Sequence, residues 1–163
     1  MPTAQERFLQ LARSRIRMNF FMFTRLPAAF FSGLRIQSID SGACAVSVPY
    51  KWFSQNPFRS TYFACLAMAA EMSSGMLAML HVYRSEPAVS MLVLTLTGNF
   101  HKKATGVTTF RCDDGPLIEE AIRKAKATGE GVTVETVSRG YSSSGELVAD
   151  FKVLWTFKAK SGR

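Results

Sequence analysis

The hydrophobic pattern of the chain is strongest over residues 60–80. Every residue of this run except Glu71 is apolar, small or uncharged, and no proline interrupts it. The run therefore predicts a helix of about five to six turns, with Ser60 or Thr61 as its N-terminal cap. A helix without a polar face is expected in a protein core. The run is long enough to cross a bilayer, but its small residues, its central carboxylate and the lack of a second such run favour a core helix.

The N-terminal region shows a second helical pattern. Residues 3–23 repeat apolar side chains at the helical period, and Thr3 and Glu6 have the spacing of a capping box. The pattern predicts one amphipathic helix, which Pro27 ends. We expect residues 1–27 to pack on the rest of the chain through the apolar face of this helix.

Six segments are rich in β-branched and aromatic residues and predict strands. They are residues 34–39, 43–50, 88–100, 104–112, 131–139 and 146–158. The last segment alternates apolar and polar residues, so one of its faces must be covered. A short surface helix over residues 116–128 separates the fourth strand from the fifth. Because hairpins can join the strands, we expect an α+β fold in which one antiparallel six-stranded sheet wraps around the long helix.

The composition limits the class of protein. With 163 residues, of which 47% are hydrophobic, the chain is expected to form a single domain over residues 1–163. Its three cysteines are widely spaced and odd in number, which favours a reducing, cytoplasmic location. The two histidines, His81 and His101, have no partner at the spacing of metal ligands, so we expect neither a metal site nor another cofactor.

The net charge of +8 indicates an anionic partner, which could be nucleic acid, a lipid head group or a phosphorylated ligand. The basic residues are scattered along the sequence, and no helix-turn-helix or ribonucleoprotein motif accompanies them, so we expect no nucleic-acid partner. The N-terminal helix carries Arg7, Arg13, Arg15 and Arg17 on its polar face. This face is expected to be solvated, and it leaves weak contact with a membrane surface open.

The lone carboxylate of the buried helix is the clearest sign of chemistry in the sequence. Burial disfavours the charged form of a carboxylate, so Glu71 must be paired, be protonated or face a cavity. Partial burial would raise its pKa towards the working pH and suit it to act as a general base or as a nucleophile. The alternative is a structural carboxylate that Ser or Thr hydroxyls and backbone amides satisfy.

Residues 30–158 resemble hotdog-fold thioesterases of the acyl-coenzyme A type, including those of the phenylacetate pathway and the relatives grouped as DUF4442. The resemblance rests on Asn56, on Tyr62-Phe63-Ala64, on Glu71 and on the closing pattern of residues 131–157. Members of the phenylacetate-pathway kind place an Asn, a His-Gly-Gly and an acid at these positions. Tyr-Phe-Ala therefore departs from the family pattern and narrows the space for a thioester carbonyl.

The resemblance implies catalytic roles for four residues. The backbone amides of Phe63 and Ala64, at the start of the long helix, would stabilise the oxyanion that forms when a thioester is attacked. Glu71 would act on water as a general base or attack the thioester itself, and Asn56 would lie beside them. The activity implied is hydrolysis of an acyl-coenzyme A or a related acyl thioester. A hydratase is a weaker alternative, because such enzymes carry a His beside the acid.

The resemblance also implies a substrate site and a partner. The residues expected to bind substrate are Thr61, Tyr62 and Met68 near the acyl group, and Lys102, Lys103 and Arg111 near the coenzyme A phosphates. Proteins of this kind dimerise by joining two sheets, and their active site lies across the interface, so Glu71 would face Asn56 or Thr61 of the other chain. We therefore expect a homodimer, with a dimer of dimers left open. The side chain of Phe63 favours the alternative of a non-catalytic protein that binds acyl groups or lipids.

Overall fold

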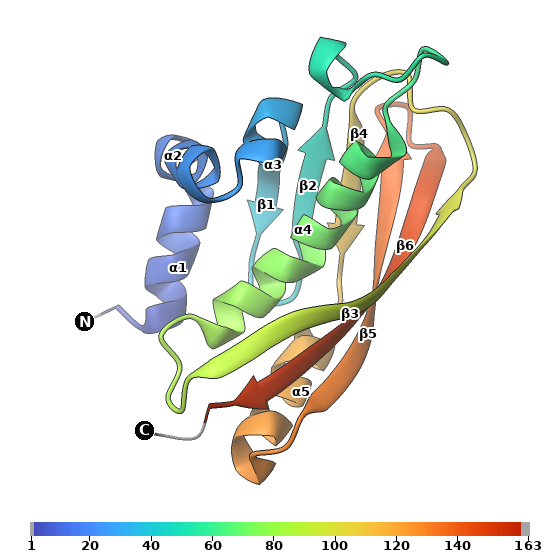
Figure 1. Cartoon of the computed structure of the whole chain (residues 1–163). Helices are drawn as coiled ribbons and strands as arrows, with labels where there is room; N and C mark the ends of the chain where they lie inside the picture. The colour runs from blue at the N-terminus through green and yellow to red at the C-terminus, as the bar shows by residue number, and fades with distance from the viewer. Residues whose placement is uncertain (1, 161–163) are drawn as a thin grey trace.

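The sheet is antiparallel throughout and has the strand order β1-β2-β4-β5-β6-β3 (Figure 1). The structure is a computed structural model that describes residues 2–160, so residues 1 and 161–163 of the expected domain lie outside it. All six predicted strands are confirmed, with shifted ends. Their bounds are β1 (Arg35–Ile39), β2 (Cys44–Val48), β3 (Val89–Phe100), β4 (Thr108–Cys112), β5 (Val132–Ser142) and β6 (Leu147–Ala159).

The long helix, α4 (Phe63–Val82), lies across one face of the curved sheet (Figure 1). By length and composition it could span a membrane, yet 67% of its most apolar 18-residue window is buried inside the fold. Small residues let it approach the strands closely: a Cβ atom at Gly75 would lie only 3.4 Å from the ring of Trp155 on β6. The prediction of a core helix is therefore confirmed, because the sheet takes the place that lipid would fill.

The N-terminal region differs from the prediction of one helix. It forms α1 (Ala4–Arg13), α2 (Arg15–Arg25) and α3 (Pro27–Ser32). The capping box of Thr3 and Glu6 is present, but Ser14 is extended and breaks the helix. The break has a packing reason, since it lets α1 bury Phe8 while packing on β1 and α4, and lets α2 bury Met22 while packing on α3. Pro27 begins a helix as well as ending one, which suits its fixed φ angle.

The surface helix α5 (Gly115–Thr128) follows β4 and buries the predicted apolar face against β5 and β6. Its buried residues belong to the same core cluster as those of α1, α2, α4 and the sheet. One edge strand is only partly buried against this core. β3 pairs only with β6 among the described residues, and it leaves Leu92, Leu94 and Leu96 between 39% and 62% exposed. The fold therefore presents a long apolar strand with one unpaired backbone edge.

Candidate active site

The start of α4 carries no side-chain cap. Tyr62 occupies the N-cap position with extended backbone angles, and its side chain makes no capping hydrogen bond. The prediction that Ser60 or Thr61 caps this helix is therefore wrong. Both residues lie just before the helix, where their side chains bond to the neighbouring loops instead.

The absence of a cap leaves two backbone donors free. Within residues 2–160, the amides of Phe63 and Ala64 find no acceptor. The two amides before them are used, since Thr61 N donates to the carbonyl of Ala104 and Tyr62 N donates to that of Ser54, each at 2.7 Å. Two free N–H groups at the positive end of a helix can bind an oxyanion, as the sequence predicts for Phe63 and Ala64.

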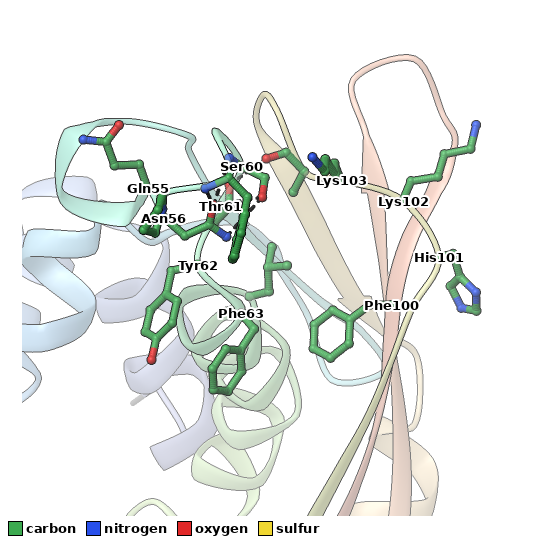
Figure 2. A pocket seen from close by; sticks show the side chains of 14 residues that line it. Gln55, Asn56, Ser60, Thr61, Tyr62, Phe63, Phe100, His101, Lys102 and Lys103 are labelled. Atoms are coloured by element: carbon green, nitrogen blue, oxygen red, sulfur yellow. Dashed lines mark hydrogen bonds between the residues drawn. The ribbon is translucent and has the colours of Figure 1, made fainter.

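A pocket of about 770 Å³ opens beside these amides. One wall is the segment 55–63 before and at the start of α4, and the other is the segment 100–104 after β3. Figure 2 shows the rings of Phe63 and Phe100 facing each other across it. The predicted site residues that line the pocket are Asn56, Thr61, Tyr62, Phe63, Lys102 and Lys103. Its walls are mostly apolar, as expected of a site for an acyl group.

Asn56 organises the wall of this pocket. Its Oδ1 accepts from the amides of Phe58, at 2.9 Å, and Ser60, at 3.2 Å. Its Nδ2 lies 3.1 Å from Ser60 Oγ. These bonds hold the turn before α4, so the amide group of Asn56 is already engaged by its own loop. Thr61 joins the two walls where they touch, because its hydroxyl donates to the carbonyl of Ala104 at 3.2 Å.

The predicted cations do not all reach the pocket. Lys102 is paired with Glu146, and in Figure 2 its side chain extends away from the start of α4. Lys103 has no ion-pair partner in the described part of the chain. Arg111 does not line the pocket and instead pairs with Asp113 at 2.7 Å. Lys103 is therefore the cation that the structure leaves available to an anionic group here.

Sequence reasoning missed Phe100 and His101, which also line the pocket. His101 Nε2 lies 2.6 Å from Asp150 Oδ2, and Asn99 Nδ2 donates to Asp150 Oδ1 at 3.0 Å. The hydrogen bond with His101, followed by that with Asn99, lowers the pKa of Asp150. A sequence feature that could have indicated these residues is the polar run His-Lys-Lys directly after the predicted strand of residues 88–100. No spacing in the sequence linked this run to the start of the long helix.

Glu71 is partly buried on α4, and burial raises the pKa of its carboxyl group. The hydroxyls nearest to it in the chain are bonded elsewhere. Ser74 Oγ accepts from Trp155 Nε1 at 3.0 Å, and Ser73 Oγ bonds to Ser138 Oγ at 2.7 Å. No group within residues 2–160 makes a hydrogen bond or ion pair with the Glu71 carboxylate. The alternative of a structural carboxylate satisfied by hydroxyls therefore finds no support.

Glu71 lies on the one stripe of α4 that the fold leaves partly open. The partly exposed residues Ala64, Met68, Glu71 and Met79 recur at helical spacing, while most other positions of α4 are buried. Glu71 does not line the pocket at the helix start. Seven residues separate it from Ala64, which corresponds to about 10 Å of helix rise. Within one chain, the carboxylate and the free amides are thus too far apart to act on the same carbonyl.

A family model matches residues 17–156, which is most of the chain, and its description is a domain of unknown function, DUF4442. The chain belongs to the DUF4442 family. No curated protein shows significant similarity to this DUF4442 chain.

Solved structures place this DUF4442 chain in the hotdog fold. A protein of unknown function from Pseudomonas aeruginosa, described as a probable thioesterase, is 19% identical with a TM-score of 0.75, covering 90% of this chain and 97% of that one. A protein of unknown function from Chlorobaculum tepidum is 15% identical, with a TM-score of 0.74 and coverage of 89% and 94%. A thioesterase from Haemophilus influenzae is 10% identical, with a TM-score of 0.62 and coverage of 90% and 91%. The chain therefore has the fold of hotdog thioesterases, as its resemblance to that superfamily implied.

Proposed function

We propose that this DUF4442 protein hydrolyses acyl thioesters, with an acyl-coenzyme A as substrate. The observation that carries the proposal is the Glu71 carboxylate, which is partly buried, has a raised pKa and has no bonding partner among the described residues. A carboxylate held in this way costs stability. The free amides at the start of α4 and the apolar pocket beside them supply the other parts that thioester hydrolysis needs.

The reaction follows from these groups. The thioester carbonyl oxygen accepts hydrogen bonds from the amides of Phe63 and Ala64, which stabilise the negative charge that develops on it. Glu71 takes a proton from water as the water oxygen attacks the carbonyl carbon. The carbon–sulfur bond then breaks, and the leaving thiolate takes the proton from Glu71. The products are a carboxylic acid and a free thiol, and Glu71 returns to its ionised form.

The separation of Glu71 from the free amides requires a second chain. We propose a homodimer in which the unpaired edges of two β3 strands join the two sheets. Exposed strand edges of this length are normally covered, and pairing would satisfy the free backbone groups of β3 and place Leu92, Leu94 and Leu96 beside side chains of the partner strand. Glu71 of one chain would then face the start of α4 in the other. Replacing Leu94 by Lys should dissociate the dimer in analytical ultracentrifugation and abolish turnover together.

Two further features support coenzyme A as the carrier and the cytoplasm as the location. Lys103 is free to bind a coenzyme A phosphate at the mouth of the pocket, whereas Lys102 must first leave Glu146. The three cysteines are all free and buried, which suits a cytoplasmic protein.

The test is turnover of acyl-coenzyme A substrates of several chain lengths, with the released thiol detected by a thiol-reactive dye. Glu71→Gln and Glu71→Ala should each lower kcat by about 10² or more. Glu135→Gln is the matched control, because Glu135 is an exposed carboxylate on β5 that pairs with Lys152. Unchanged activity in both Glu71 variants would refute the proposed role of this residue.

A non-catalytic acyl-binding protein is the second candidate. It is favoured by the exposed ring of Phe63 in the pocket and by the position of Glu71 outside that pocket within one chain. It predicts that an acyl ligand copurifies with the protein and that no substrate turns over. Mass spectrometry of the organic extract, run beside the turnover assay, separates the two functions.

A further inference from the structure

A second exposed apolar surface lies on α2, α3 and the 3₁₀ helix η1 (Trp52–Ser54). We define it as the aromatic face, which consists of Ile16, Phe20, Phe23, Phe31, Trp52 and Phe53. Ring contacts join four of its members, which come from all three elements. Phe23 lies 6.3 Å from Phe31, Phe31 lies 5.9 Å from Phe53, and Phe53 lies 6.4 Å from Trp52, measured between ring centroids. Three elements thus form one aromatic surface.

The exposure of this face is large. Ile16 is 84% exposed, Trp52 81% and Phe20 69%. Contiguous apolar surface of this kind on a folded protein marks a site of interaction with another protein or with a membrane. Packing does not require these exposed residues to be apolar, since α2 already buries Met18 and Met22 on its other face.

The charges around the aromatic face are positive. Residues 1–60 contain eight Lys and Arg against two Asp and Glu, whereas residues 61–163 contain twelve against ten. Lys and Arg are thus about equally frequent in both parts, but the part that forms this face holds few acidic residues and has a net charge of +6, against +2 for the rest of the chain. Arg15, Arg17, Arg25 and Lys51 are exposed, and none has an ion-pair partner within residues 2–160. Such a surface repels a second copy of itself and attracts an anionic partner.

A groove along α2 also combines apolar and basic side chains. It measures about 770 Å³ and is lined by Leu11, Ile16, Phe20 and Phe21 together with Arg17 and Arg25. Apolar walls beside two arginines match an amphipathic anion that consists of a hydrocarbon chain and a negative head group. This feature is independent of the ring contacts and points to the same chemistry.

We propose that the aromatic face docks on an anionic lipid bilayer. Trp and Phe side chains enter the interfacial region of a bilayer, while Arg and Lys bind the anionic head groups. Figure 1 shows α2, α3, η1 and the first turn of α4 at the same end of the molecule. Docking therefore brings the pocket at the start of α4 towards the membrane. The proposal does not depend on thioester hydrolysis, because it concerns binding alone.

The two tryptophans allow a direct measurement with the full chain. Trp52 is 81% exposed and Trp155 is 2% exposed, so a blue shift of the emission on adding vesicles reports Trp52. Vesicles of phosphatidylcholine with one-third phosphatidylglycerol should give the shift and cosediment with the protein, and vesicles of phosphatidylcholine alone should bind much more weakly. Binding to the anionic vesicles should fall about tenfold or more as salt is raised towards 1 M.

Charge variants distinguish docking through the aromatic face from a general attraction of the basic protein to anionic lipid. Arg15→Gln, Arg17→Gln and Arg25→Gln combined should weaken binding about 100-fold. The matched control combines Lys124→Gln, Lys158→Gln and Lys160→Gln, which removes three exposed charges from other elements and should leave binding within about threefold of wild type. Equal weakening by both sets would overturn the proposal.

Apolar variants complete the test. Phe20→Ser and Trp52→Ser change exposed side chains and should preserve the thermal unfolding temperature while abolishing cosedimentation. Failure of the wild-type chain to bind anionic vesicles would overturn the proposal. So would self-association that Phe20→Ser abolishes in the absence of vesicle binding, since a second copy would then cover the face.

Discussion

Two inactive variants should restore each other's activity if the proposed site is shared between chains. Glu71→Gln removes the base, and Phe63→Pro removes one free backbone donor. Proline is favoured at the first position of a helix, and Tyr62 already has φ −61° and ψ 134°, which suit a residue before proline. Phe63→Ala is the matched control, because it removes the same ring and keeps the N–H group.

The magnitudes follow from the geometry. Loss of one oxyanion donor costs about 10²–10³ in kcat, or roughly 2.7–4 kcal/mol, and Phe63→Ala should retain most of the activity. Ala64 and Glu71 of one chain lie about 10 Å apart along α4, so each site of the proposed dimer would combine the amides of one chain with the carboxylate of the other. A heterodimer of Glu71→Gln with Phe63→Pro therefore holds one intact site and one doubly damaged site. It should show about half of the wild-type activity.

The assay uses coexpressed chains with two different affinity tags, and tandem purification isolates the heterodimer for turnover of an acyl-coenzyme A. A second heterodimer pairs the wild-type chain with the double variant and should be inactive, because each of its sites lacks one part. If the site lay within one chain, the results would be reversed: the first heterodimer would be inactive and the second would keep half of the activity. That outcome would refute the shared site.

Three further predictions concern the same helix and the cysteines. Burial raises the pKa of Glu71 above its value in the unfolded chain, so the protonated carboxyl group favours the folded state at acid pH, and this contribution is lost as pH rises through the folded pKa. In thermal unfolding, Glu71→Gln should therefore equal wild type near pH 4 and be more stable than wild type at pH 8. At Gly75 a new Cβ would lie 3.1 Å from Glu71 Oε1 and 3.4 Å from the ring of Trp155. Gly75→Ala should therefore displace the carboxylate and lower kcat, while the crowding offsets the gain of about 0.5–1 kcal/mol that Ala brings to a helix. Unchanged kcat would contradict the proposed position of the carboxylate. Burial raises the pKa of Cys44 and of Cys112 to about 12. A thiol-reactive dye should therefore label the cysteines only after denaturant is added. Rapid labelling of the native protein would count against the buried positions of the cysteines.

Much of the fold was predictable because its elements have strong periods. The alternating residues of β6, the uninterrupted apolar run of α4 and the capping box of α1 each depend on local contacts, which the order of residues specifies. The break at Ser14 was not predictable in this way. The apolar period continues through it, and only the separate packing of α1 and α2 on the fold makes two helices more stable than one.

The candidate site was predictable only in part. Glu71 stood out because it is the one charged residue of an apolar helix, whereas Phe63 and Ala64 were assigned through the resemblance to hotdog thioesterases. Phe100 and His101 were missed because they reach the pocket from a strand about 40 residues further along the chain. Arg111 was expected near the pocket, but the register of β4 places it between Ala45 of β2 and Arg139 of β5, and its guanidinium pairs with Asp113, two residues along the chain.

The amino-acid sequence by itself determined that a carboxylate would lie in an apolar helix and that the helix would begin near Phe63. Only the tertiary structure decided that Ser73 and Ser74 bond to the sheet, so that Glu71 has no partner, and that Thr61 bonds to Ala104, so that the first helical amides stay free. The reason is physical. Periodicity specifies which residues share a face, but hydrogen-bond partners distant in sequence are chosen only when the sheet closes around the helix.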